Sequence, residues 1–149
     1  MDLDLIKMNL DVQNNEELIR ILGSALLEKG CVKGTYIDAV IEREKTLPTG
    51  LDLGEIGVAI PHTDSQHVNK ANIAVGLLKK PIKFHCMIEP KKEIDVQLVF
   101  LLAIENPEAQ VELLGKLMGV FQNIELLKYI QNAENKEKIA NKLKNIITK

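Results

Sequence analysis

Aromatic residues are scarce in this sequence: they make up 3% of its 149 residues, with no Trp, two Tyr and three Phe. Proteins that stack nucleic-acid bases or sugar rings use aromatic side chains for that contact. The shortage therefore argues against a base-stacking surface and against an aromatic sugar-binding shelf. It also predicts a core built from Ile, Leu and Val.

Charge of one sign is also lacking. The 19 basic and 21 acidic residues give a formal net charge of -2, and no strongly one-signed block interrupts the mixture. A nucleic-acid binder usually presents a basic face. We therefore expect no nucleic-acid partner.

Long apolar runs and paired cysteines are missing as well. No run reaches the roughly 18 apolar residues of a membrane span, so no direct membrane insertion is expected. The first residues, MDLDLIKMNLDV, carry acids where a secretory signal carries Lys or Arg. Cys31 and Cys86 follow no CxxC pattern and fit reduced, buried thiols, with a disulfide as the alternative. These features predict a cytoplasmic protein.

The chain alternates between helical and extended patterns. Its length predicts one domain over residues 1–149. A capping-box-like pair, Asn14 and Glu17, marks the start of a helix that ends at Gly30. Pro48 and Gly50 mark a loop. Apolar patterning predicts strands at 6–12, 57–60, 73–78 and 94–104, and helices at 16–30, from Thr35, from Pro107, at 124–130 and at 135–147. This alternation predicts an α/β domain with a mixed or mostly parallel sheet.

His62 is the most informative of the three histidines. It follows the apolar strand GVAI and Pro61, and ligand sites in open α/β sheets gather at the carboxyl ends of strands. We expect the proline to anchor the ring and present it to solvent. A neutral imidazole has a free lone pair and suits nucleophilic attack on phosphorus. An ordinary surface histidine at a strand end is the alternative interpretation.

A metal site is the competing hypothesis. His62 and His67 bracket Asp64, and His85 stands next to Cys86. A zinc site needs three or four ligands together in space, and this spacing lacks the helical HExxH geometry. The sequence also contains no GxSxG, GxxxxGK[ST] or GxGxxG motif, so we expect neither a metal nor a nucleotide cofactor.

Two further residues have both a structural and a functional interpretation. Arg43 lies in a mixed run of charges, where most side chains are simply solvated. Its guanidinium could alternatively bind phosphoryl oxygens through its planar set of donors. Gln110 is by default a plain helix residue, and its amide could donate to an anion.

The string REKTLPTGLDLGEIGVAIPHTD, at 43–64, resembles the signature of enzyme IIA components of the bacterial phosphoenolpyruvate-dependent sugar phosphotransferase system. The resemblance is to the mannitol/fructose-type superfamily, and it continues through PIKFHCM and VQLVFLLAIENPEAQVELLGKLMGVFQ. The PTG loop before GVAIPHT and the ENPxxQ run look most like the galactitol-type branch. The resemblance implies a single-domain α/β sandwich with a mixed, mostly parallel sheet flanked by helices.

The resemblance also implies roles for individual residues. The family's phosphorylated histidine, in the IPH turn, corresponds to His62, with the tele nitrogen as the candidate acceptor. The arginine of the RE pair corresponds to Arg43, which would stabilise phosphoryl charge. Mannitol-type members have a second histidine where this sequence has Gln110, as the galactitol-type pattern does. Gln110 is therefore a possible hydrogen-bond donor to the phosphoryl group.

The implied function is phosphoryl transfer during uptake of a sugar or a galactitol-like hexitol. The phosphocarrier protein HPr would phosphorylate His62, which would pass the group to a cysteine of an enzyme IIB component. Two alternatives stay open at this point. One is a regulatory IIA-like module, in which phosphorylation of His62 controls a partner protein. The other is a metal-dependent hydrolase that uses His62, His67 and Asp64.

Overall fold

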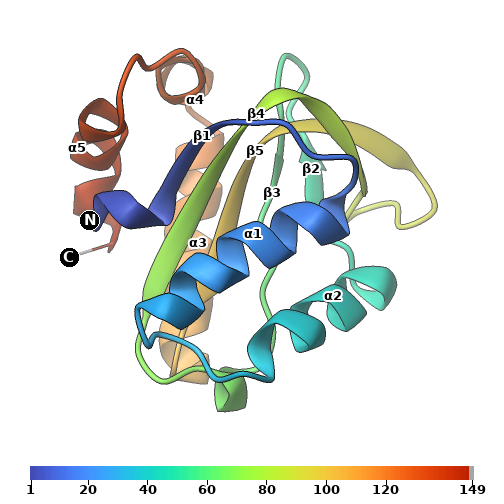
Figure 1. Ribbon diagram of the computed structural model, residues 1–149. Helices are drawn as coiled ribbons and strands as arrows, with labels where there is room; N and C mark the ends of the chain where they lie inside the picture. Colours follow the sequence, from blue (N-terminus) through green and yellow to red (C-terminus); the bar gives the residue numbers. More distant parts are fainter. Residues whose placement is uncertain (148–149) are drawn as a thin grey trace.

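A five-stranded mixed sheet forms the centre of the protein (Figure 1), as seen in a computed structural model that describes residues 1–147. Its strands lie in the order β1-β4-β5-β3-β2. The pairs β1–β4 and β3–β5 are parallel, whereas β4–β5 and β2–β3 are antiparallel. The strands are β1 (Ile6–Leu10), β2 (Gly50–Asp52), β3 (Gly57–Ala59), β4 (Asn72–His85) and β5 (Glu93–Ala103).

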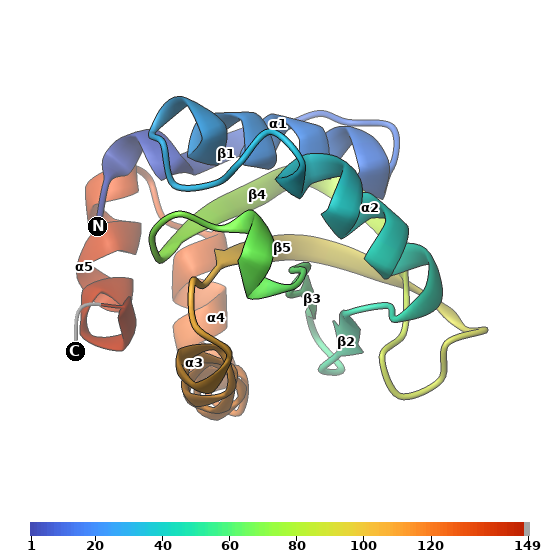
Figure 2. The ribbon, with the colours of Figure 1, turned by 90° about the horizontal axis from the view of Figure 1, so that it is seen from below.

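Helices cover both faces of this sheet (Figures 1 and 2). The helices α1 (Asn15–Glu28) and α2 (Tyr36–Thr46) pack on one face. The other face packs against α3 (Pro107–Phe121), α4 (Ile124–Gln131) and α5 (Lys136–Ile147). The α/β sandwich with a mixed sheet between helices, expected from the sequence, is confirmed. Among residues 1–147, no helix combines the length and the apolar character needed to cross a bilayer.

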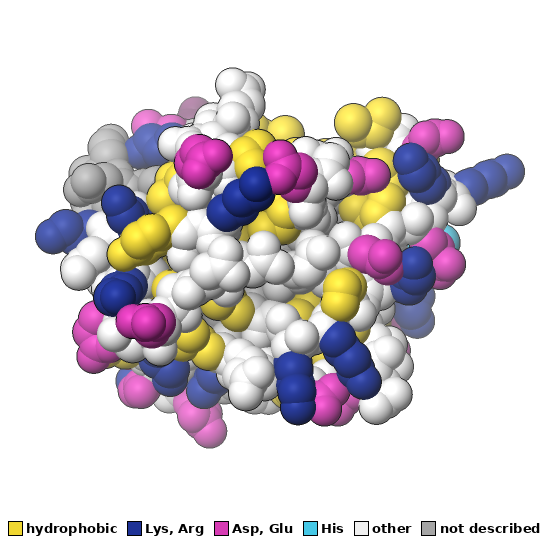
Figure 3. All heavy atoms as spheres, turned by 90° about the horizontal axis from the view of Figure 1, so that it is seen from above, with side chains coloured by type: hydrophobic (Ala, Val, Ile, Leu, Met, Phe, Trp, Pro, Cys, Tyr) yellow, Lys and Arg dark blue, Asp and Glu magenta, His cyan; other side chains and the backbone are white. Residues whose placement is uncertain are grey.

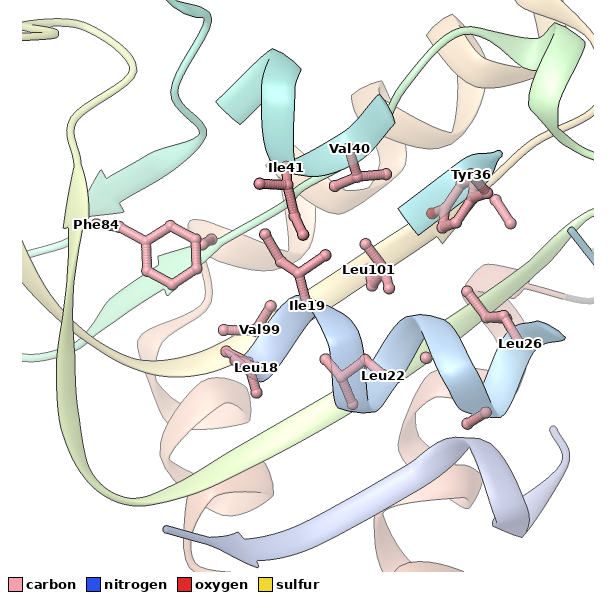
Figure 4. Packing of buried hydrophobic residues seen from close by; sticks show 14 of the residues in the cluster. Leu18, Ile19, Leu22, Leu26, Tyr36, Val40, Ile41, Phe84, Val99 and Leu101 are labelled. Atoms are coloured by element: carbon pink, nitrogen blue, oxygen red, sulfur yellow. The ribbon is translucent and has the colours of Figure 1, made fainter. Parts of the chain in front are cut away.

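The central strand β5 explains why both layers of helices are needed. Its side chains alternate between the two cores: Val99 and Leu101 face α1 and α2, whereas Leu98 and Phe100 face the other helices. Figure 4 shows the first core, in which Leu18 and Leu22 of α1 lie beside Val99 and Leu101. All of these side chains are fully buried, at 0% exposed. The continuous apolar run therefore forms a strand covered on both faces, as predicted.

The helix ends also follow from the sequence. The side chain of Asn14 accepts a hydrogen bond from the Glu17 backbone, and the Glu17 carboxylate accepts one from the Gln13 backbone. These reciprocal bonds satisfy two amide groups at the start of α1. Gly30 follows the helix with a φ of 73°, a conformation that glycine adopts without strain. Pro107 is the first residue of α3, as predicted.

Two extended segments differ from the prediction. The loop expected around Gly50 contains the short strand β2, and β4 continues past Leu78 to His85. Three residues are too few to show a period, which is why β2 has no sequence signal. In β4, the apolar run ends at Leu78, and Pro81 lies where the ladder with β5 shifts register between Leu77 and Ile82. An interrupted ladder tolerates a residue that cannot donate a hydrogen bond.

Close packing of β3 on β5 predicts that Gly57→Ala destabilises the protein. A Cβ at position 57 would overlap the backbone carbonyl oxygen of Asp95, which cannot move without disturbing β5. We expect a loss of about 2 kcal/mol or more in the free energy of unfolding. Urea denaturation measures this change.

Gly119→Ala is the matched control. Gly119 lies within α3, and an added Cβ would meet no atom of the described residues within 4 Å. Alanine favours the helix, so we expect a gain of about 0.5–1 kcal/mol in the free energy of unfolding. Equal effects of the two substitutions would contradict the packing argument.

Candidate functional site

His62 lies three residues beyond the last residue of β3, at the carboxyl end of that buried strand. Its Nδ1 atom is 2.8 Å from the carbonyl oxygen of Ile60. A carbonyl oxygen only accepts hydrogen bonds, so Nδ1 must carry the proton in this contact. The neutral ring therefore keeps its lone pair on Nε2, the tele nitrogen. This contact thus leaves Nε2 as the ring nitrogen with a free lone pair.

The ring of His62 is more enclosed than its position in the sequence suggested. We expected a ring presented to solvent, but the residue is only 8% exposed. The reason is that the segment after Pro61 lies between α2 and α3 (Figure 2). Gln110 of α3 donates a hydrogen bond to the carbonyl oxygen of Thr63 at 3.3 Å, which fixes this segment from one side.

Enclosure sets the charge state of His62. Burial lowers the pKa of its imidazole, and the positive charge of Arg43 lowers it further. The hydrogen bond to Ile60 and the negative charge of Asp64 act in the opposite direction without reversing the shift. The ring is therefore neutral near pH 7, with its lone pair free.

Arg43 supplies a positive charge on the α2 side of the site. It is half-buried in the last turns of the helix, and its charge acts on the His62 ring. Within the described part of the chain, the buried Nε atom of Arg43 has no hydrogen-bond partner. A buried donor without an acceptor costs about 1–3 kcal/mol, and more when it is charged. An anion that reached this guanidinium would supply an acceptor.

The structure therefore brings the three predicted residues to one place. His62 comes from the end of β3, Arg43 from α2 and Gln110 from the first turns of α3. The Gln110 amide has two N–H groups, one of which bonds to the Thr63 carbonyl oxygen. This set contains a nucleophilic nitrogen, a cation and an uncharged donor, a combination suited to a phosphoryl group.

The other histidines serve local structure. His67 bonds through Nδ1 to the hydroxyl of Thr35 at 2.8 Å, and His85 bonds through Nδ1 to the Pro90 carbonyl oxygen at 2.8 Å. Across residues 1–147, no group of three or more His, Cys, Asp or Glu side chains is arranged to hold a metal ion. The structure thus gives no support to a hydrolase built on His62, His67 and Asp64.

The cysteines lie where the sequence predicted, inside the protein. Cys31 and Cys86 are both buried free thiols. Basic and acidic side chains are interspersed on the face shown in Figure 3. That face carries no broad patch of one sign of the kind that attracts nucleic acid.

Sequence reasoning missed one buried polar group at this site. Glu44 is 7% exposed and accepts hydrogen bonds from the backbone N–H and the hydroxyl of Thr49. It looked like one of several charges crowding the end of a helix. The available signal was its spacing, because Ile37, Val40, Ile41 and Glu44 follow the helical period and place Glu44 on the inward-facing stripe.

Comparison with known proteins identifies similar chains. The family model described as "Phosphoenolpyruvate-dependent sugar phosphotransferase system, EIIA 2" matches residues 1–146. The galactitol-specific EIIA component of Escherichia coli K12 is 31% identical over 123 residues, which are 82% of this chain and 81% of that protein.

Solved structures have the same fold. One of them is a chain in the complex of the mannitol enzyme IIA and phosphorylated enzyme IIB from E. coli. It matches this chain with a TM-score of 0.79 and 20% identity, and the match covers 97% of each chain. The nitrogen regulatory protein IIA-Ntr of Neisseria meningitidis has a TM-score of 0.73 and 25% identity, with 95% of this chain and 94% of that chain covered.

The enclosure of His62 predicts a low imidazole pKa, measurable by NMR titration. We expect His62 to titrate below the ordinary value of 6.5, because burial and the charge of Arg43 both oppose protonation. Arg43→Ala should raise this pKa by removing the cation. The exposed Arg20, which pairs with Glu16, provides the control Arg20→Ala, which should leave it unchanged.

The same shift predicts a dependence of stability on pH. Folding lowers the His62 pKa, so the unfolded chain binds more protons below pH 6.5. The contribution of His62 to stability is therefore complete above pH 6.5 and is lost as the pH falls through the folded pKa. Urea denaturation at several pH values should show a smaller acid loss in His62→Gln than in the wild type. An identical loss in both proteins would contradict this assignment.

Proposed function

The chain belongs to the EIIA 2 family of the phosphoenolpyruvate-dependent sugar phosphotransferase system, whose members pass on phosphoryl groups through a histidine, and we propose that His62 is this histidine here. The observation that best supports the proposal is the hydrogen bond from His62 Nδ1 to the Ile60 carbonyl oxygen. It leaves Nε2 as the nucleophile in a ring whose pKa is lowered by burial. Phosphorylation would then give a tele-phosphohistidine.

The transfer has two steps. In the first, the Nε2 lone pair of His62 attacks the phosphorus atom carried by HPr; the new N–P bond forms as the bond between phosphorus and its donor breaks. In the second, a cysteine thiolate of the IIB partner attacks the same phosphorus, and the bond to Nε2 breaks with its electrons returning to the ring. Both steps need in-line alignment and charge stabilisation, and no metal.

Arg43 and Gln110 would supply that stabilisation. The unpartnered Nε belongs to the Arg43 guanidinium, whose charge acts on the His62 ring, and phosphoryl oxygens are strong acceptors. Gln110 has an amide N–H beyond the one that bonds to Thr63 and adds an uncharged donor. Arginine contributes most because its charge opposes the charge that spreads over the phosphoryl oxygens.

The partners and the sugar are inferred from relatives. A structural relative is a mannitol enzyme IIA in complex with phosphorylated enzyme IIB, which supports a IIB partner here. The similarity to a galactitol-specific EIIA component supports a galactitol-like hexitol as the transported substrate. Two buried free thiols are consistent with a cytoplasmic location, where cysteines are kept reduced.

A regulatory module is the second candidate function. The 25% identity to a nitrogen regulatory IIA protein favours it. Its chemistry at His62 would be the same, and only the destination of the phosphoryl group would differ. Rapid transfer from His62 to a galactitol-type IIB would favour transport, whereas a stable phosphohistidine in the presence of IIB would favour regulation.

The acceptor assignment predicts that enzyme I, HPr and phosphoenolpyruvate add one acid-labile, base-stable phosphate to the protein. His62→Ala should abolish incorporation, measured with radiolabelled phosphoenolpyruvate. His67→Ala and His85→Ala are matched controls that should keep it, because both rings bond to local structure. Label that persists in His62→Ala, or that never enters the wild type, would refute the proposal.

The role of Arg43 predicts a large kinetic effect without unfolding. Removing one charged donor from a transition state slows transfer by about 100-fold or more, so we expect that loss for Arg43→Ala in rapid-quench measurements. The chain has one other arginine, Arg20, which is exposed on α1, and Arg20→Ala should transfer at the wild-type rate. Gln110→Ala should slow transfer by a smaller factor, about threefold to tenfold. An unchanged transfer rate in Arg43→Ala or in Gln110→Ala would contradict the role proposed for that residue.

A further inference from the structure

The buried carboxyl group of Glu44 is not explained by phosphoryl chemistry alone. Glu44 lies next to Arg43 on α2 but points into the protein, where it is 7% exposed. One oxygen accepts from the Thr49 backbone N–H at 2.8 Å, and the other accepts from the Thr49 hydroxyl at 2.9 Å. Burial of a carboxyl group is unfavourable unless its hydrogen bonds are satisfied, so this pair holds the turn between α2 and β2 closed.

Thr49 connects this turn to the strand that carries the site. Its carbonyl oxygen accepts a hydrogen bond from the backbone N–H of Ile60 at 3.3 Å. That bond extends the pairing of β2 with β3 by one step beyond Gly50 and Ala59. The Ile60 carbonyl oxygen in turn accepts from His62 Nδ1 at 2.8 Å. Hydrogen bonds therefore connect Glu44, through Thr49 and Ile60, with the His62 ring.

The segment around Thr49 is also fixed from its other side. The carbonyl oxygen of Gly50 accepts a hydrogen bond from the Met87 backbone at 2.8 Å. A Cβ at position 50 would lie 2.6 Å from the carbonyl oxygen of His85, so the two backbones are in close contact. With this side held against the end of the β4–β5 hairpin, the bonds of Glu44 determine how α2 meets β2.

We propose that Glu44 is a positioning residue, whose carboxyl group joins the turn of α2 that carries Arg43 to the strand end that carries His62. Through Thr49 and Ile60 it fixes the acceptor of the Nδ1 proton, and through the helix it fixes the cation beside the ring. The kinetic part of this inference rests on the proposed function of His62. The effect on the ring tautomer does not.

Glutamine can take over this role, which provides a sharp comparison. Burial raises the pKa of Glu44 to about 7, against the opposing influence of the Thr49 bonds and of the charges of Arg43 and His85. The Thr49 hydroxyl donates to the ionised carboxylate; when the carboxyl is protonated, the hydroxyl can rotate to accept from it, and the Thr49 N–H still donates to the other oxygen. A glutamine amide offers the same donor and acceptor. Glu44→Gln should therefore keep the connection, whereas Glu44→Ala removes it.

The test measures the His62 tautomer by nitrogen-15 NMR and the rate of phosphoryl transfer from phospho-HPr in the same variants. In the wild type, Nδ1 should carry the proton. Glu44→Ala should give a mixture of tautomers and a fall of about tenfold in the transfer rate, because small misplacements of reacting groups cost this much or more. Glu44→Gln should restore the wild-type tautomer and a rate within about threefold of the wild type.

Two further variants decide the remaining outcomes. Glu42→Ala removes an exposed carboxylate from the same helix, one that pairs with Lys45, and should change neither measurement. Thr49→Val removes only the hydroxyl bond and should shift the tautomer and the rate partway, which keeps the test valid if Glu44→Ala does not fold. If Glu44→Ala folds and shows the wild-type tautomer and rate, the proposal is overturned. If Glu44→Ala does not fold, the same result in Thr49→Val overturns it. If phospho-HPr fails to phosphorylate the wild type, the proposed function falls, and the tautomer alone still tests Glu44.

Discussion

The hydrogen bond between His62 Nδ1 and the Ile60 carbonyl oxygen is the interaction on which the proposed chemistry depends. It spans only two residues, so the chain can form it only where β3 has ended and Pro61 turns the backbone. Ile60 must itself be fixed, and it is, because its side chain is 2% exposed in the core beneath α3 to α5. A short buried strand thus determines which nitrogen of the ring is left to react.

The charge of Arg43 has two effects at this site, and both favour the proposed transfer. It lowers the pKa of His62, which keeps the ring neutral and nucleophilic. It also attracts an incoming phosphoryl group. Two unit charges about 4 Å apart interact by about 4 kcal/mol at an effective dielectric constant of about 20. That attraction exceeds the roughly 1–3 kcal/mol lost by leaving a buried donor without a partner in the free protein. In the proposed function, an anion beside Arg43 would therefore more than offset the cost of the unpartnered Nε atom.

Much of this architecture follows from local sequence patterns, and the parts that do not have physical reasons. The run at 94–104 predicted a strand buried on both faces because β5 is apolar at successive positions. The strand β2 could not be predicted, since Gly50–Asp52 is too short to show a period and forms only by pairing with β3. The residues of the site were predicted from the resemblance to enzyme IIA components and from the position of His62 at a strand end. The enclosure of His62 depends on contacts with α2 and α3, which lie far from it in sequence.

The burial of Glu44 follows from the helical spacing of its position together with the hydrogen bonds that its carboxyl group needs. A carboxylate within a charged run is usually solvated, yet the helical period places this one on the stripe of Val40 and Ile41. A charged residue at a core position has to be satisfied by nearby donors, and Thr49, five residues later, supplies two of them. Thr49 directly precedes β2. The hydrogen bonds that satisfy the buried carboxyl group of Glu44 therefore also set the distance between α2 and the sheet. The need to satisfy one buried carboxyl group thus limits where Arg43 and His62 can lie relative to each other.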